Sequence, residues 1–176
     1  YSAEGIAAIA RRQTASTAGS IFVTGSPRSG TTLVQQILTG HSAVNGGGEL
    51  ARLPLLAGEF GGHSFPAVQA WIQARGAAPA ALLWRHWLSE LFPAPGRVVD
   101  KSIDTTRFIG LAAALLPEAS LIWLERDPLD RAWSCFRTFF PTTMPWSYDL
   151  RDIAFHLRLE DDLLRRWQDI LGERLM

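Results

Sequence analysis

The stretch that most constrains this chain is SIFVTGSPRSGTTLVQQILTGH, at residues 20–41. It opens with an apolar, β-prone run at 21–23, continues through a turn from Gly25 to Gly30, and then carries apolar residues at helical spacing. Strand, glycine-rich loop and helix in this order are typical of a phosphate-binding loop. The loop amides and the positive end of the helix would both face a bound anion.

The loop departs from the nucleoside-triphosphatase pattern G-x-x-x-x-G-K-[ST] at one position. Gly25 and Gly30 keep the spacing, but Thr31 stands where that pattern has lysine. Without this lysine, a clamp on β- and γ-phosphates is not expected. Arg28 supplies a fixed charge and a fork of donors from inside the loop instead. A glycine-rich turn without a ligand is the alternative, but strand, loop, hydroxyl pair and helix together argue against it.

The run P-R-S-G-T-T-L after a short strand resembles the 5′-phosphosulfate loop of sulfotransferases, which use 3′-phosphoadenosine 5′-phosphosulfate (PAPS) as donor. The likeness covers about 21–171 and is strongest to bacterial sulfotransferases that are often fused to tetratricopeptide repeats. Tyrosylprotein sulfotransferases are more distantly similar. The resemblance implies that PAPS is held by the loop residues Ser26, Pro27, Arg28, Ser29, Gly30, Thr31 and Thr32.

The same resemblance divides the chain into two parts. Residues 1–19 would form an N-terminal helix and linker, at the place where relatives join an upstream repeat domain. Residues 20–176 would form the catalytic domain without its C-terminal part, because relatives continue into another strand and a loop that covers the nucleotide.

Glu49 follows the glycines at 46–48, which suggest either a backbone that passes close to another segment or a mobile loop. Without the resemblance, Glu49 is interpreted as a carboxylate at a helix N-terminus, where its negative charge interacts favourably with the helix dipole. Relatives place their proposed catalytic base in a Gly-Glu here, so the resemblance implies that Glu49 takes the proton of the acceptor, and we expect it to be buried. His41 and His63 are the competing bases.

Two further strand ends carry charges. Lys101 follows a short strand at 97–99, and Arg126 follows another at 120–124. Ligands bind at the carboxyl ends of the strands in open α/β sheets. The resemblance implies that Lys101 lies next to the sulfuryl group and acts in catalysis with Arg28. It also implies that Arg126 and Ser134, which match an R-D-P…S element, bind the 3′-phosphate.

Strands that alternate with helices predict an α/β protein with a P-loop-type, three-layer fold: a mostly parallel sheet flanked by helices. The expected strands are 21–23, 97–99 and 120–124. A long helix at 148–171 is expected to bury an apolar stripe and to leave its charged residues on a solvated face. The aromatic, proline-containing segment 139–147 is expected to be a loop that lines an acceptor site or caps the core.

The composition of the chain excludes several classes of binding partner. The net charge is zero, which argues against nucleic acid. The single cysteine, Cys135, excludes an internal disulfide and is typical of a reducing compartment. No apolar run reaches the length of a membrane span and no signal peptide is visible, so a cytoplasmic protein is expected. No metal is expected, because a sulfuryl group lacks the charge density that makes Mg²⁺ necessary in phosphoryl transfer.

Three functions remain open at this point. The first is a PAPS-dependent sulfotransferase that acts on a hydroxyl or an amine of a small molecule, sugar or peptide and releases adenosine 3′,5′-bisphosphate. The second is a P-loop nucleotide kinase or NTPase, against which the missing loop lysine counts. The third is a nucleotide-binding module without catalysis. The sequence leaves the acceptor and the oligomeric state open.

Overall fold

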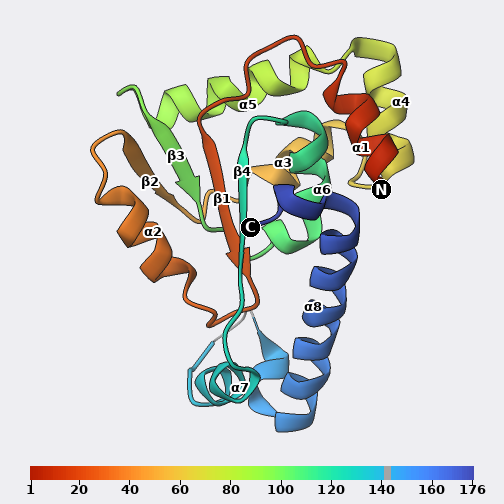
Figure 1. The fold of residues 1–176 in the computed structure, drawn as a ribbon. Helices are drawn as coiled ribbons and strands as arrows, with labels where there is room; N and C mark the ends of the chain where they lie inside the picture. Colours follow the sequence, from red (N-terminus) through yellow and green to blue (C-terminus); the bar gives the residue numbers. More distant parts are fainter. Residues whose placement is uncertain (141–143) are drawn as a thin grey trace.

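A four-stranded parallel sheet forms the centre of the protein (Figure 1) in a computed structural model that describes residues 1–140 and 144–176. The strands are β1 (Ser20–Gly25), β2 (Val44–Gly48), β3 (Arg97–Asp100) and β4 (Ser120–Leu124). They lie in the order β2-β3-β1-β4, and every pairing is parallel. The predicted α/β class with a parallel sheet flanked by helices is confirmed.

Helices cover both faces of the sheet (Figure 1). They are α1 (Ala3–Ala10), α2 (Thr31–Thr39), α3 (Arg52–Glu59), α4 (Phe65–Arg75), α5 (Ala78–Leu91), α6 (Thr105–Leu115), α7 (Pro128–Phe136) and α8 (Leu150–Leu171), with short 3₁₀ turns η1 (Pro145–Tyr148) and η2 (Gly172–Arg174). Among the described residues, no helix combines the length and the apolarity that a bilayer crossing requires.

Strand β1 separates two hydrophobic cores because its side chains alternate between the faces of the sheet. On one face, Ile21 and Val23 form a small core against which Val34 and Leu38 of α2 pack. On the other face, Phe22 belongs to the larger core, which helices α1, α3 to α6 and α8 also build. The N-terminal helix α1 therefore packs into the larger core together with α3 to α6 and α8.

Strand β2 corrects the interpretation of the glycine run. Residues 46–48 are not a mobile loop, because β2 pairs with β3, with a shift of register between Gly46 and Gly48. The alternative expectation, a close backbone approach, is confirmed at Gly47, where a Cβ would lie 2.7 Å from the carbonyl oxygen of Val99. Glycine has low β-propensity, so the strand could not be recognised from side-chain alternation.

The parallel sheet brings three predicted site segments to one edge. The carboxyl end of β1 leads into the loop predicted to bind phosphate, named the phosphate loop here, that of β3 leads into Lys101, and that of β4 into Arg126. The aromatic segment 139–147 lies partly outside the described residues, and its end enters the 3₁₀ turn η1 before α8 begins. At the other side of β4, Leu175 forms a parallel bridge with Leu121.

Candidate functional site

The phosphate loop between β1 and α2 is held by close backbone packing. At Gly25, where φ is 148°, a Cβ would lie 2.5 Å from the carbonyl oxygen of Leu124 in β4. Arg28 has a φ of 69°, in the left-handed region that residues other than glycine rarely adopt. Such backbone strain costs about 1–3 kcal/mol and persists only where the surroundings determine the conformation, often at functional sites.

Side chains of α7 and α8 supply those surroundings. Arg28 Nε donates to Ser134 Oγ at 2.9 Å. Arg131 Nη1 donates to Ser26 Oγ at 2.7 Å, and its Nη2 donates to Asp161 Oδ1 of α8 at 3.0 Å. The Arg131 side chain is only 6% exposed. One buried guanidinium thus connects the phosphate loop, α7 and α8.

Sequence reasoning missed Arg131, and the reason lies in α7 itself. Leu129, Trp133 and Phe136 recur at helical spacing, a pattern that normally marks the buried face. In the structure these three side chains are exposed, whereas Arg131 and Ser134 face inward. Apolar periodicity therefore points to the wrong face of this helix, and no local pattern distinguishes Arg131 from a surface arginine.

Arg126 lies beside the phosphate loop. Its Nη1 donates to the carbonyl oxygen of Arg28 at 3.4 Å, and its Nη2 pairs with Asp130 Oδ2 at 3.2 Å. The Arg126 side chain is 44% exposed, so this ion pair adds little to stability and the guanidinium is accessible to an anion. The hydroxyl of Ser134 accepts a hydrogen bond from Arg28. The two residues of the R-D-P…S element, Arg126 and Ser134, therefore both contact Arg28.

The structure brings Glu49 and Lys101 into direct contact. Lys101 Nζ lies 2.7 Å from Glu49 Oε1, and the two side chains are 15% and 56% exposed. The expected burial of Glu49 is therefore wrong. The contact follows from the sheet, because β2 and β3 are neighbours and the Lys101 amide donates to the carbonyl oxygen of Gly48 at 2.8 Å.

A chain of hydrogen bonds fixes the segment after Glu49. Ala51, with a φ of 50°, donates its amide to Ser102 Oγ at 3.0 Å, and this hydroxyl donates to Asp100 Oδ1 at 2.5 Å. Burial raises the pKa of Asp100, and the hydroxyl and amide of Ser102 oppose that rise. A buried carboxyl group at the end of β3 thus positions the backbone that carries Glu49.

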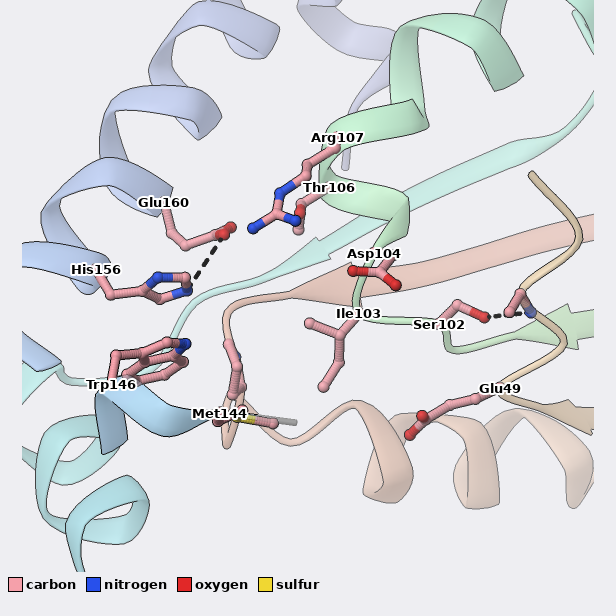
Figure 2. Close-up of a pocket in the computed structure, with 12 residues that line it drawn as sticks. Glu49, Ser102, Ile103, Asp104, Thr106, Arg107, Met144, Trp146, His156 and Glu160 are labelled. Atoms are coloured by element: carbon pink, nitrogen blue, oxygen red, sulfur yellow. Dashed lines mark hydrogen bonds and ion pairs between the residues drawn. The ribbon is translucent and has the colours of Figure 1, made fainter. Parts of the chain in front are cut away.

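Two adjoining hollows open at this edge of the sheet. The first, of about 600 Å³, is named the cationic cleft here and is lined by Pro27, Arg28, Gly30, Thr31, Thr32, Leu33, Gln36, Glu49, Lys101, Ile103, Arg126, Phe140 and Met144. The second, of about 370 Å³, is named the acidic pocket and is lined by Pro27, Glu49, Ala51, Ser102, Ile103, Asp104, Thr106, Arg107, Met144, Trp146, His156 and Glu160 (Figure 2). Glu49 lines both hollows.

Helix α8 contributes two titratable groups to the acidic pocket. The Glu160 side chain is only 8% exposed, and its Oε1 lies 3.6 Å from His156 Nε2, whose ring stacks on Trp146 at 3.9 Å between centroids (Figure 2). Burial raises the pKa of Glu160 and lowers that of His156. The prediction that the charged residues of this helix form a solvated face is wrong at Glu160.

The two histidines weighed as alternative bases lie elsewhere. His41 Nδ1 accepts a hydrogen bond from the Ala43 amide at 3.1 Å, in the turn after α2. The His63 ring packs edge-on against Phe108. Neither residue lines the cationic cleft or the acidic pocket, whereas His156 lines the latter. Within residues 1–140 and 144–176, no group of three or more His, Cys, Asp or Glu is placed to hold a metal ion.

Comparison with known proteins decides the family. The model of the Sulfotransferase family matches residues 20–176. The chain belongs to the sulfotransferase family. The matched range begins at the first residue of β1, so in this sulfotransferase-family chain it includes every described strand and both hollows. The resemblance read from the phosphate loop is confirmed, whereas the likeness to proteins fused to tetratricopeptide repeats stays a prediction.

A curated relative is an uncharacterized protein of Aquifex aeolicus (strain VF5), which is 32% identical over 162 residues. The aligned region covers 85% of this sulfotransferase-family chain and 21% of that protein, so the chain spans about a fifth of the length of the relative.

Proposed function

We propose that this chain transfers the sulfuryl group of PAPS to a hydroxyl or amine acceptor. The observation that carries the proposal is the cationic cleft, where Arg28, Lys101 and Arg126 come together from the ends of three parallel strands. A ligand with several negative charges suits such a cleft. The phosphate loop beside these cations adds backbone amides at a helix N-terminus.

The residues present fit the two charged ends of PAPS. Arg28 and the loop from Ser26 to Thr32 would bind the 5′-phosphosulfate, and Arg126 would bind the 3′-phosphate. Ser134 already accepts a hydrogen bond from Arg28, so we assign it the further task of orienting that guanidinium. The donor supplies an electrophilic sulfur, and the protein contributes charge and position.

Glu49 lines both the cationic cleft and the acidic pocket, which supports a role in proton transfer. We propose that Glu49 takes the proton of the acceptor as the new bond from the acceptor oxygen or nitrogen to sulfur forms. The bond between sulfur and the bridging oxygen breaks, and its electron pair leaves with the phosphate. Lys101 stabilises the charge that develops on this oxygen.

The ion pair between Glu49 and Lys101 implies that donor binding precedes proton transfer. Lys101 Nζ lies 2.7 Å from Glu49 Oε1, so the ammonium occupies the carboxylate oxygen that a proton of the acceptor would have to reach. The phosphates of the donor would compete with Glu49 for Lys101. Donor binding would therefore draw Lys101 into the cationic cleft and free Glu49 to receive a proton.

Turnover of PAPS tests the proposal directly. Purified protein is incubated with PAPS that carries a labelled sulfuryl group and with a mixture of phenols, sugars and amines. We expect labelled sulfated products and stoichiometric adenosine 3′,5′-bisphosphate, both lost in Lys101→Met. Transfer of the γ-phosphate of ATP without turnover of PAPS would support a nucleotide kinase instead, and neither activity in a protein that binds the bisphosphate would support a binding module.

A further inference from the structure

We propose that the acidic pocket holds the acceptor through an ammonium group and that Glu160 is the anchor of this group. The preferred acceptor then carries an amine separated by an apolar segment from the hydroxyl that reacts near Glu49. The inference rests on the proposed function for the reaction of that hydroxyl, but the binding preference can be measured without any turnover.

The Glu160 carboxylate lacks a partner for one of its oxygens. Its side chain is more than nine-tenths buried, and Oε2 makes no hydrogen bond to any residue that the structure describes. A buried carboxylate oxygen without a donor is costly, since that oxygen has lost its water and has no hydrogen bond in its place. An ammonium in the pocket would donate hydrogen bonds and supply the missing positive charge.

The protein's own groups do not supply this positive charge: the Thr106 hydroxyl in the pocket lining lowers the pKa of Glu160, but it is neutral. Arg107 lines the pocket and lowers the pKa of Glu160 from a distance, but among the described residues it forms no ion pair with that carboxylate. His156 lies 3.6 Å from Oε1, on the other oxygen, and its pKa is lowered by burial and by Arg107, which favours the neutral ring. Figure 2 shows Glu160 directed into the space between His156 and Arg107.

The charges of the whole pocket favour a cation. Three carboxylates line it, Glu49, Asp104 and Glu160, against one guanidinium, that of Arg107. Glu49 is already paired with Lys101, whereas Asp104 is exposed and adds negative potential to the pocket. An anionic acceptor would meet these carboxylates, so the field of the pocket selects against it.

The shape of the pocket sets the distance between amine and hydroxyl. Glu49 lies at one end, next to the cationic cleft, and Glu160 lies at the other (Figure 2). Ile103 and Met144 line the space between them, which suits an apolar segment. A hydroxyl near Glu49 and an ammonium near Glu160 would place an acceptor with its reacting oxygen toward the cationic cleft.

Calorimetric titration with three matched phenols tests the preference. The probes are tyramine, which carries an ammonium, 4-propylphenol, its neutral isostere, and 4-hydroxyphenylpropionate, which carries a carboxylate. We expect tyramine to bind about tenfold more tightly than 4-propylphenol, the scale of one charge-assisted contact, and the carboxylate to bind most weakly. Equal affinities, or tightest binding of the carboxylate through Arg107, would overturn the inference.

Two variants on α8 assign the preference to one side chain. Glu160→Gln removes the charge without changing the shape and should bring tyramine and 4-propylphenol to within about twofold of each other. Asp169→Asn makes the same chemical change at an exposed position of α8 and should keep the wild-type preference. A preference for tyramine that survives in Glu160→Gln would show that another group binds the ammonium, and the inference would fall.

Titration of the same samples with adenosine 3′,5′-bisphosphate separates this inference from the proposed function. Bisphosphate binding without any preference for tyramine would sink the inference and leave the proposed function intact. A preference for tyramine that Glu160→Gln abolishes, in a protein that does not bind the bisphosphate, would support the pocket and contradict the proposed function.

Discussion

The cationic cleft and the acidic pocket share one wall but are built in different ways. The cleft takes its charges from segments that begin where parallel strands end, and each segment carries a recognisable run of residues. The pocket takes His156 and Glu160 from the middle of a long helix and Trp146 from a 3₁₀ turn, none of them in a motif. The comparison teaches that the cationic cleft follows from sheet topology, whereas the acidic pocket depends on how α8 packs.

Glu49→Gln should have the largest effect, because Glu49 lies on the shared wall. We expect turnover of PAPS to fall by about 10²–10⁴-fold while affinity for adenosine 3′,5′-bisphosphate is retained, since the amide cannot accept the proton. Steady-state kinetics and a nucleotide titration measure the two effects, with the exposed Glu90→Gln as the control. Full activity in Glu49→Gln together with lost activity in His156→Gln would transfer the base role to His156.

Arg28→Ala should lower turnover strongly and change the stability of the protein only slightly. We expect turnover to fall by about 10²–10³-fold, as for the loss of a donor that stabilises transition-state charge. The free energy of unfolding should change by only about 1 kcal/mol, the worth of the bond to Ser134. Arg166→Ala, at an exposed position of α8, is the control. Turnover within about twofold of wild type, well under 1 kcal/mol of barrier, would remove Arg28 from the mechanism.

Arg131→Met should mainly lower stability, because the buried Arg131 side chain donates a hydrogen bond to Ser26 of the phosphate loop. The substitution leaves Asp161 without its cation and Ser26 without its donor, so we expect the free energy of unfolding to fall by about 2–4 kcal/mol. Urea denaturation measures the loss. Arg165→Met removes the exposed ion pair with Asp162 and should cost less than about 1 kcal/mol. Similar losses in the two variants would mean that burial of Arg131 contributes nothing.

The smallest effect is a pH dependence that belongs to the acidic pocket. Burial raises the pKa of Glu160, so the unfolded chain releases this proton at lower pH than the folded protein does. Wild type should therefore lose stability as pH rises from the ordinary range of a glutamic acid to the raised pKa, relative to Glu160→Gln. Asp100, whose pKa burial also raises, is present in both proteins and cancels in the difference. Parallel stability curves for the two proteins would contradict the raised pKa.

The sequence predicts the cationic cleft better than the acidic pocket. The phosphate loop, Lys101 and Arg126 are predictable because local strand and turn patterns place them and because parallel strands end at one edge. Arg131 and Glu160 were missed, since a buried charge on a helix is indistinguishable from a surface charge until its neighbours are known. Strand β2 was missed because its glycines carry no side chains from which alternation could be read.

The central claim is that the cationic cleft is built for a nucleotide with phosphates at both the 5′ and the 3′ position. Isothermal titration with adenosine 3′,5′-bisphosphate, adenosine 5′-monophosphate and ATP tests it most directly. We predict that the bisphosphate binds most tightly and that Arg126→Ala removes about 2–3 kcal/mol of that affinity while binding of the monophosphate barely changes. Equal affinity for bisphosphate and monophosphate, or tighter binding of ATP, would contradict the account.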